Sequence, residues 1–258
     1  MPDNDLNLLI EASRKAAEIA LHHWKSDQKI IEKPDGAGPV SEGDLAVDAY
    51  LHKTLLAARP DYGWLSEETA DTEHRLDKKR VFIVDPIDGT RSYIAGERTW
   101  ALSLAVVEDG QPIAGVVYLP VRQKLYSSAR GRGAFLNQNP IETSQRKEAD
   151  GGTILAPKSN LDPMHWPNGV PDMTKHFRPS LAYRLSLIAE GRFDAMLTLR
   201  DTWEWDIAAG ALIAAEAGAR VTDSRGKRLE LNGKRAKTSG VLLANPTLHA
   251  SLARGMAG

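Results

Sequence analysis

Apolar residues recur at intervals of three and four through the first 24 positions, which is the spacing of one helical face. They are Leu6, Leu9, Ile10, Ala17, Ala20, Leu21 and Trp24. We therefore predict an amphipathic helix there. Segment 33–41 is polar and holds two glycines and two prolines, so it predicts a loop. A second helix is expected from about Asp44 to Ala58 and should end before Pro60, because the residue preceding a proline disfavours helical backbone.

The period of the apolar pattern then changes to that of a strand. Residues 81–84 form a continuous apolar run, which predicts a short buried strand. Alternating and β-branched residues predict three more strands, at 99–107, 112–118 and 124–129. A turn signal at 108–110 separates the first two of these three, so we expect consecutive antiparallel strands.

A polar stretch at 142–152 is the best candidate for a domain boundary. Beyond it, strand-like and helix-like segments alternate, as in an α/β layer. They are strands at 153–156, 193–199 and 241–244, and helices at 181–190, 206–217 and from Pro246 onward. We predict an α/β protein with two units, 1–146 and 147–258.

The 258 residues include 33 Lys plus Arg and 34 Asp plus Glu, for a formal charge of −1. This balance gives no reason from composition to expect nucleic acid or an anionic membrane as a partner. The absence of cysteine excludes disulfides, thiolate zinc sites, iron–sulfur clusters and a cysteine nucleophile. The amino end lacks the features of a signal peptide, and the longest apolar stretch, 207–215, is too short to cross a bilayer. We expect a soluble cytoplasmic protein.

The strongest chemical signal is the sequence Val-Phe-Ile-Val-Asp85-Pro-Ile87-Asp88-Gly89-Thr90. A buried strand here leads into two carboxylates, with a proline that restricts the turn and a glycine that allows close approach of another group. Asp85, Asp88 and the Ile87 carbonyl offer three oxygen ligands, which hard divalent cations such as Mg²⁺ prefer. The amides of Gly89 and Thr90 could open a helix and bind phosphate. A turn with solvated aspartates is the alternative interpretation.

Two further acidic clusters stand apart from this motif. Glu67 and Glu68 follow a short apolar run, and taken alone such a pair is usually a solvated surface. Asp206 is expected as the first residue of a helix rich in small side chains, where a carboxylate suits the positive end of the helix dipole. A plain N-cap aspartate would also explain Asp206, and that use does not exclude a metal role.

Together, the three clusters resemble the inositol monophosphatase family of Mg²⁺-dependent, lithium-sensitive phosphatases. They have the family's order and separations: Glu67-Glu68, Asp85-Pro-Ile-Asp-Gly-Thr90 and Trp205-Asp206-Ile-Ala-Ala-Gly210. Asp44 falls where the family keeps an aspartate that partners the motif threonine. Ser41, three residues earlier, departs from the family's usual Thr-x-x-Asp. The similarity extends from the first helix to the last.

The resemblance implies a fold, a cofactor and a reaction. The fold is a layered α/β sandwich, with an α+β unit at 1–146 that contains an antiparallel sheet and a smaller α/β unit at 147–258 that contributes Asp206. The site between the units would bind roughly two to three Mg²⁺ ions and hydrolyse a small phosphate monoester with an activated water. Members commonly form homodimers, so the resemblance also implies a homodimer.

Carried over residue by residue, the resemblance also implies the metal ligands. Glu67, Asp85 and the Ile87 carbonyl would hold the first ion. Asp85, Asp88 and Asp206 would hold the second, and a weaker third would lie near Glu67. This set is chemically consistent, because a metal lowers the pKa of its water and two ions can clamp the attacking and leaving oxygens of an in-line displacement.

The implied catalytic residues are Asp44, Thr90 and Glu68. The Asp44–Thr90 pair would orient and deprotonate the attacking water. The implied phosphate and substrate contacts are Gly89, Thr90, Arg184 and Asp206. No phosphoenzyme is needed, so the lack of cysteine is no obstacle.

Leu199 separates this chain from the inositol-specific members, which have a polyol-contacting glutamate at that position. Segment 202–206 and Tyr183-Arg184 look more like the bacterial branch that removes the 3′-phosphate of 3′-phosphoadenosine 5′-phosphate. We therefore predict that nucleotide as the leading substrate, with inositol 1-phosphate or another sugar or polyol phosphate as the alternative. Arg184 would be a cation for the second phosphate or, alternatively, a partner in a surface salt bridge.

Other enzyme classes lack their motifs in this chain. Asp3-Asn-Asp5 is the sole Asp-x-Asp, and it lies at a polar amino end rather than after the buried strand that a haloacid-dehalogenase-type phosphatase needs. No Gly-x-Ser-x-Gly elbow occurs, and Gly131-x-Gly133 lacks the third glycine of a dinucleotide site. A non-catalytic regulator or scaffold that kept the fold is the alternative from another class, and the intact acidic set argues against it.

Overall fold

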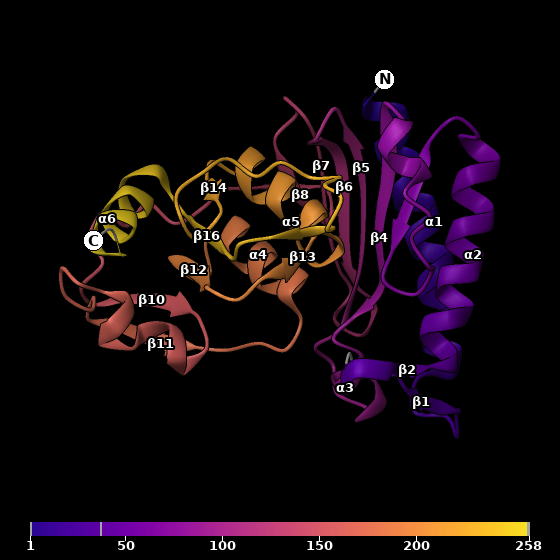
Figure 1. The fold of residues 1–258 in the computed structure, drawn as a ribbon, viewed down its shortest axis with the longest axis horizontal. Coiled ribbons are helices and arrows are strands. Elements are labelled where there is room, and N and C mark those ends of the chain that lie inside the picture. The colour runs from indigo at the N-terminus through magenta and orange to yellow at the C-terminus, as the bar shows by residue number, and fades with distance from the viewer. Residues whose placement is uncertain (1, 37, 257–258) are drawn as a thin grey trace.

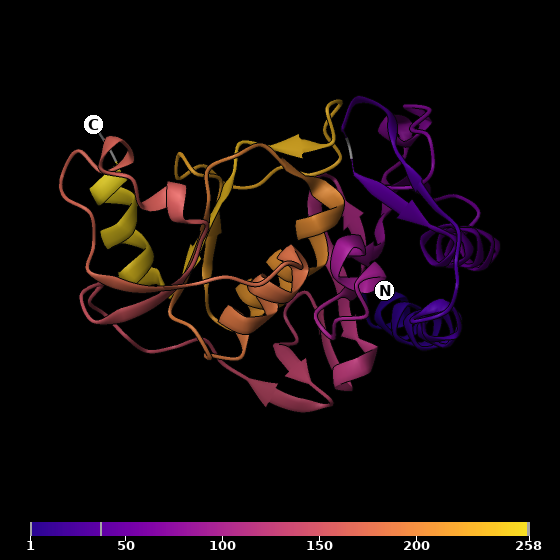
Figure 2. The same ribbon diagram turned by 90° about the horizontal axis from the view of Figure 1, so that it is seen from below.

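Helices and sheets alternate in layers through the residues that this computed structural model describes, 2–36 and 38–256 (Figure 1). In order, the layers are α1 (Pro2–His23) with α2 (Glu42–Ala58), a seven-stranded sheet, α4 (Leu181–Ala189) with α5 (Glu204–Glu216), a five-stranded sheet, and α6 (Pro246–Met256). Figure 2 shows α1 and α2 side by side on the outer face of the first sheet. The predicted layered α/β class is confirmed.

The first sheet has the strand order β3-β4-β5-β6-β7-β8-β9. Its strands are β3 (Gly63–Ser66), β4 (Arg80–Asp88), β5 (Ala101–Glu108), β6 (Gln111–Leu119), β7 (Lys124–Ala129), β8 (Ala134–Leu136) and β9 (Asn139–Ile141). β3 and β4 are parallel, whereas the neighbours from β4 to β9 are antiparallel. The three consecutive antiparallel strands expected between 99 and 129 are confirmed as β5, β6 and β7.

The strand expected at 81–84 is longer in the structure, because β4 continues to Asp88. A register shift between Asp85 and Asp88 keeps the chain paired with β5, where Asp85 lies opposite Ser103 and Asp88 opposite Ala101. Such an irregularity bends a strand and redirects its side chains. The acidic motif is therefore part of the sheet rather than a turn beyond it.

The second sheet has the order β11-β10-β12-β16-β14. Its strands are β10 (Gly152–Leu155), β11 (Met173–His176), β12 (Ala195–Thr198), β14 (Arg220–Thr222) and β16 (Val241–Ala244). The pairs around β10 are parallel, and β16 is antiparallel to both its neighbours. The polar stretch at 142–152 connects the two sheets. The division into units 1–146 and 147–258 stays a prediction, and α4 and α5, which follow it, share one apolar core with strands of both sheets.

Two short two-stranded sheets complete the structure. β1 (Ile30–Glu32) is antiparallel to β2 (Pro39–Ser41), and β13 (Thr202–Trp203) is antiparallel to β15 (Lys237–Thr238). The segment 33–41 was expected to be loop throughout, but its last three residues form β2. The local pattern gave no sign of this strand, because its partner lies before the polar segment.

Small side chains let α5 approach its neighbours closely. A Cβ added at Gly210 would lie 2.7 Å from the Cβ of Leu185 on α4, and one added at Gly115 of β6 would lie 3.1 Å from the backbone of Ala209. Real Cβ atoms essentially never lie at the first distance and seldom at the second, so glycine at these two positions lets α5 fit closely between α4 and the first sheet. At the start of α5, the carbonyl of Trp205 accepts a hydrogen bond from the hydroxyl of Ser103, which lies opposite Asp85 in the first sheet.

Most predicted helices are confirmed with small shifts at their ends. α1, α2, α4 and α6 cover the segments expected to be helical. The helix expected from 206 begins earlier, at Glu204, so Asp206 is its third residue and not its first. Residues Thr202–Trp203 pair as a strand immediately before it, and this tertiary pairing sets the start of the helix. A short helix, α3 (Thr90–Ile94), follows Gly89, as the motif suggested.

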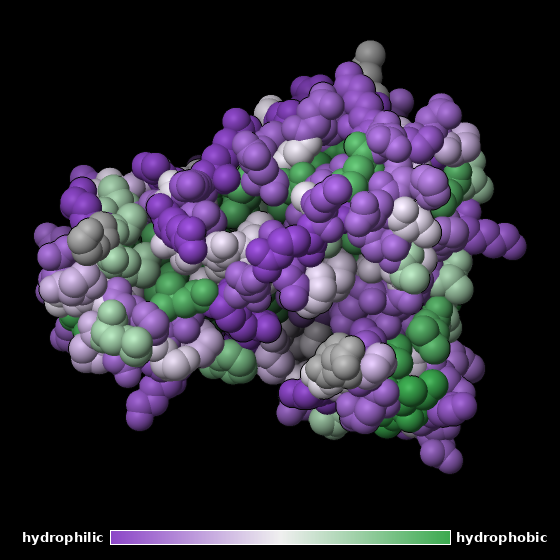
Figure 3. Space-filling view, in the orientation of Figure 1, coloured by the Kyte–Doolittle hydropathy of each residue, from purple (hydrophilic) through white to green (hydrophobic). Residues whose placement is uncertain are grey.

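The face shown in Figure 3 is mostly hydrophilic. Apolar residues gather at its lower right, over β1 and the start of α2, where Ile30, Ile31 and Leu45 are exposed. Within the described ranges, no helix combines the length and the apolar character that crossing a membrane requires.

Candidate active site

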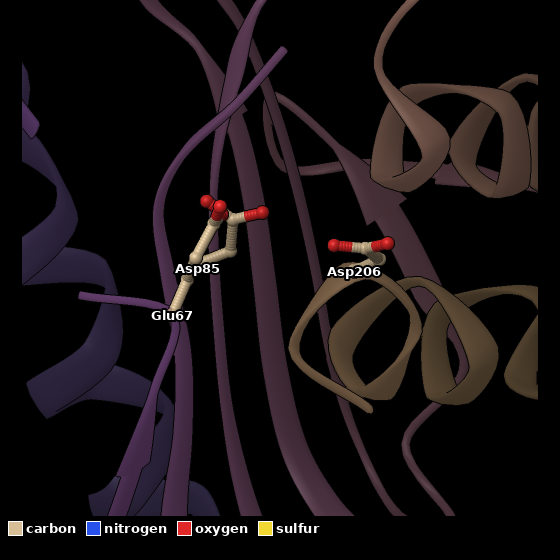
Figure 4. Close-up of side chains that lie close together, drawn as sticks. All are labelled: Glu67, Asp85 and Asp206. Atoms are coloured by element: carbon tan, nitrogen blue, oxygen red, sulfur yellow. The ribbon is translucent and has the colours of Figure 1, made fainter. Parts of the chain in front are cut away.

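Three carboxylates from separate elements converge beside the first sheet (Figure 4). Glu67, Asp85 and Asp206 each offer an oxygen, and these oxygens lie within 4.8 Å of one another. β3 and β4 are parallel, and Ser66 lies opposite Val84. The next residue along each strand direction is Glu67 in one chain segment and Asp85 in the other, so these two residues lie side by side. Asp206 comes from the first turn of α5, which packs against the face of the first sheet. The structure thus brings together residues from all three acidic clusters of the sequence.

The electrostatics of this cluster favour a bound cation. Asp85 is 1% exposed, and its Oδ1 has no hydrogen-bond partner among the described residues. Burial, with the charges of Glu67, Asp88 and Asp206, raises the pKa of Asp85 well above its usual value. Burial and the charge of Asp88 do the same to the pKa of Asp206. A hard divalent cation takes oxygen ligands and would relieve both the repulsion and the unpaired oxygen, so the residues fit a metal such as Mg²⁺.

Asp88 lies beside this cluster and is tied to the second half of the chain. Its Oδ2 accepts hydrogen bonds from the Ser180 hydroxyl and the Ala182 amide, each at 2.6 Å. Ser180 is the N-cap of α4. Burial raises the pKa of Asp88 to about 6, although these hydrogen bonds oppose the shift. Asp88 therefore links the acidic motif to the start of α4, and it is not one of the three residues whose oxygens converge.

Asp44 and Thr90 are in contact. The Thr90 hydroxyl lies 3.1 Å from Oδ1 of Asp44 and 3.2 Å from the carbonyl of Ile87. Oδ2 of Asp44 accepts from the amide and hydroxyl of Ser41 at 2.8 and 2.6 Å, which closes a capping box at the start of α2. Ser41, which stands in place of the usual threonine, thus forms a complete capping box with Asp44. Burial raises the pKa of Asp44, against the hydrogen bonds from Ser41 and Thr90.

Gly89 precedes α3 with a φ of +98°, in the left-handed region that favours glycine. A side chain at this position would be strained by the backbone itself, whatever the space around it. The carbonyl of Gly89 accepts from the amide of Tyr93. The motif glycine is thus needed for the chain to turn from β4 into α3, which places Thr90 next to Asp44.

The side chain of Glu68 is largely shielded from solvent, which corrects the interpretation of the Glu pair as a solvated surface. Its side chain is 4% exposed. The ammonium of Lys33 lies 2.8 Å from Oε1 of Glu68 and 2.8 Å from Oε1 of Glu67. Burial raises the pKa of Glu68 to about 7, although Lys33 opposes the shift. Lys33 was not a candidate from the sequence, because it lies in the polar segment 33–41 with nothing local to mark it.

A pocket of about 550 Å³ opens onto the acidic cluster. Its lining includes Phe177, Arg184, Arg200 and Trp203. Arg184 is 5% exposed and donates to the carbonyls of Arg178 and Pro179, with its guanidinium 4.3 Å from the centre of the Phe177 ring. A surface salt bridge, the alternative interpretation of Arg184, is therefore wrong.

Arg184 has no carboxylate in an ion pair within the described ranges. Burial lowers its pKa to about 10, although the charges of Asp88 and Asp206 oppose the shift. The two carboxylates and the two carbonyl acceptors offset only part of the cost of burying this guanidinium, because its pKa stays below the usual value. Since Arg184 lines the pocket, an anionic ligand group there would stabilise its charge further.

Comparisons with known proteins agree with these observations. A family model described as the inositol monophosphatase family matches residues 1–257. An inositol-1-monophosphatase from Mesorhizobium japonicum is 32% identical over 235 residues, 86% of each chain. A histidinol-phosphatase from Chlorobaculum parvum is 30% identical over 239 residues, 89% of this chain and 90% of the other. Among solved structures, the extragenic suppressor protein suhB from Bartonella henselae has a TM-score of 0.84 at 27% identity and covers 98% of both chains.

Proposed function

Because the chain belongs to the inositol monophosphatase family, we propose that it is a Mg²⁺-dependent phosphomonoesterase whose leading substrate is 3′-phosphoadenosine 5′-phosphate. The relatives named inositol-1-monophosphatase and histidinol-phosphatase are phosphoric monoester hydrolases, and this chain is a phosphatase of the same family. The metal, the substrate and the residue roles are the proposal. A cytoplasmic location and a homodimer stay predictions.

Glu67, Asp85 and the Ile87 carbonyl would hold one Mg²⁺ ion, and Asp85, Asp88 and Asp206 a second, with a weaker third near Glu67. The converging carboxylates and the unpartnered Oδ1 of Asp85 support this assignment. When bound, Mg²⁺ supplies Lewis acidity toward phosphoryl oxygens and lowers the pKa of a water molecule.

The chain's own residues would move the proton. The Thr90 hydroxyl donates a hydrogen bond to Oδ1 of Asp44, so its proton would pass to Asp44 as Thr90 Oγ1 takes a proton from the attacking water. Glu68 has a pKa of about 7, which suits proton exchange near neutral pH. The amides at Gly89 and Thr90, which line the same pocket, would contact the phosphate.

The observation that supports this substrate is the buried Arg184, which lines the pocket and forms no ion pair within the described residues. A bisphosphate brings a second anion that would pair with this guanidinium, whereas a monophosphate brings only the scissile group. Arg200, which makes no side-chain hydrogen bond or ion pair within the described part of the chain, lines the same pocket and adds positive charge. Leu199 offers no polar contact to a polyol. The 32% identity to an inositol-1-monophosphatase keeps inositol 1-phosphate as the second candidate.

The test measures Mg²⁺-dependent phosphate release from 3′-phosphoadenosine 5′-phosphate, inositol 1-phosphate and histidinol phosphate at matched concentrations. We expect kcat/KM for the nucleotide to exceed the others by about tenfold or more, the value of one good charged contact. Protein carrying Asp85→Asn, purified in the same way, controls for contaminating phosphatase. A higher kcat/KM for inositol 1-phosphate or histidinol phosphate would overturn the proposal that the nucleotide is the leading substrate. No turnover of any phosphomonoester by folded protein would favour a non-catalytic regulator.

A further inference from the structure

Asp48 holds the chain on both sides of the Glu67–Glu68 pair. Its Oδ1 accepts a hydrogen bond from the hydroxyl of Ser66, and its Oδ2 accepts one from the hydroxyl of Thr69, each at 2.5 Å. Ser66 is the last residue of β3, and Thr69 follows the two glutamates. One carboxylate thus fixes the residue before and the residue after the pair.

Asp48 lies on the buried face of α2, one turn after Asp44. The other buried side chains of this face include Val47, Leu51 and Leu55. Asp48 is 7% exposed and forms no ion pair with any Lys, Arg or His of the described ranges. An apolar side chain would continue the face of the helix at lower desolvation cost. The carboxylate at this position is therefore held by its two hydroxyl partners and not by a cation.

The segment that Asp48 holds leads directly to the metal cluster. The amide of Glu67 bonds to the carbonyl of Val84 at 3.3 Å, next to Asp85. With Ser66 and Thr69 also fixed, the backbone of the pair is fastened at three points. The backbone of Glu67 is therefore fixed in position, and its carboxylate lies close to those of Asp85 and Asp206.

We infer that Asp48 is a positioning residue that fixes Glu67 for metal binding through the Ser66 and Thr69 hydroxyls. The inference rests on the proposed role of Glu67 as a metal ligand. Residues that hold metal ligands through hydrogen bonds tune metal affinity by about 10- to 100-fold. Asp48 acts by geometry, so removing either the carboxylate or the hydroxyls weakens metal binding.

The experiment titrates Mg²⁺ calorimetrically into substrate-free protein carrying Asp48→Asn, Ser66→Ala or Thr69→Val. Asp194→Asn is the matched control, because Asp194 also accepts hydroxyls, from Ser144 and Thr153, but lies outside the pocket. We expect Asp48→Asn to raise the Mg²⁺ dissociation constant about tenfold or more, and each hydroxyl variant about threefold or more. Asp194→Asn should leave it within about twofold. At saturating Mg²⁺, kcat of the Asp48→Asn protein should return to within about threefold of the parent.

Two outcomes would overturn the inference. If Mg²⁺ affinity is unchanged in the Thr69→Val and Ser66→Ala proteins, the hydroxyls do not position Glu67; these mild variants decide the matter even if Asp48→Asn fails to fold. If the two hydroxyl variants bind Mg²⁺ like the parent while the Asp48→Asn protein binds it more weakly, Asp48 acts through its charge and not by positioning Glu67. Glu67→Gln separates this inference from the proposed function. If the Glu67→Gln protein binds Mg²⁺ as tightly as the parent, Glu67 is not a metal ligand and the proposed site is wrong. If it binds Mg²⁺ more weakly while the Thr69→Val and Ser66→Ala proteins bind it normally, only the positioning role of Asp48 is wrong.

Discussion

The ammonium of Lys33 lies 2.8 Å from the carboxylate of Glu67, the same carboxylate that converges with Asp85 and Asp206. Lys33 follows β1, and its contact with Glu67 spans 34 positions of the chain. A lysine ammonium is a compact, mobile cation. Lys33 therefore neutralises part of the acidic cluster in the structure, and a metal at Glu67 must share or displace this contact.

Replacing Lys33 should strengthen metal binding. Lys33→Met keeps much of the stem and removes the charge, so a divalent cation no longer faces a competing positive group. We expect apparent Mg²⁺ affinity to rise about fivefold, which corresponds to about 1 kcal/mol. Mg²⁺ dependence of activity and calorimetric titration both measure this. Lys15→Met, which removes an exposed pair with Glu18, is the control. Weaker binding in Lys33→Met would instead mean that the lysine helps to assemble the site.

Asp85→Asn should abolish activity while leaving the metal-free protein at least as stable as the parent. The carboxylate is buried among Glu67, Asp88 and Asp206, whose charges repel it, and its amide isostere removes that repulsion. We expect kcat to fall by about a thousandfold or more, as for loss of a group that binds the catalytic ion. Phosphate release and thermal unfolding without Mg²⁺ provide the two measurements. Turnover close to that of the parent protein would remove Asp85 from the site.

Arg184→Met should discriminate between substrates. If the guanidinium pairs with a second phosphate, its loss raises KM for 3′-phosphoadenosine 5′-phosphate by about tenfold or more, while KM for a simple monophosphate changes by less than about threefold. Since Arg184 also supports the backbone at Arg178 and Pro179, thermal unfolding of the variant is measured alongside. Equal effects on both substrates would show that Arg184 only shapes the pocket.

His249 should make stability fall in mild acid. It is 1% exposed on α6, with its ring nitrogen 2.9 Å from the Thr222 hydroxyl. Burial and the nearby charge of Arg220 lower its pKa to about 4. Between pH 6.5 and about 4 the unfolded chain binds a proton that the folded chain does not, so stability falls as pH falls through this window.

The loss should reach up to about 2 kcal/mol at pH 5 and be absent from His249→Gln. Urea unfolding of both proteins at pH 7 and pH 5 measures the difference between their slopes. Taking the difference cancels the opposite contribution of the buried carboxylates, whose raised pKa values favour the folded state as pH falls. Parallel slopes in the two proteins would exclude His249 as the cause.

The acidic residues of the site could be predicted from the sequence because their local settings are recognisable. Asp85, Asp88 and Thr90 lie in one contiguous motif, and the apolar run before it predicts the strand that carries them. Asp206 was placed in the correct helix, but the helix begins two residues earlier than expected, at Glu204. That error arose because β13 and β15 pair across the chain and decide where α5 begins.

Other features depended on contacts that no local pattern contains. Glu68 looks like a surface residue beside Glu67, but its side chain is 4% exposed and is paired with Lys33. Arg184 looks like any exposed arginine until its helix is packed against Phe177 and the pocket. Asp48 reads as a polar position of an amphipathic helix, and only the approach of β3 gives it two hydroxyl partners.

The sequence by itself determined the α/β class, the family and the acidic residues proposed as ligands, because strand alternation and a contiguous acidic motif that ends in glycine are local properties. The tertiary structure decided which of these side chains are buried, which meet, and which cations and hydroxyls lie against them. The physical reason is that burial and pairing are properties of segments far apart in the chain. Ser180 reaches Asp88 across 92 positions, and the energy of each charge depends on that environment and not on its neighbours in sequence.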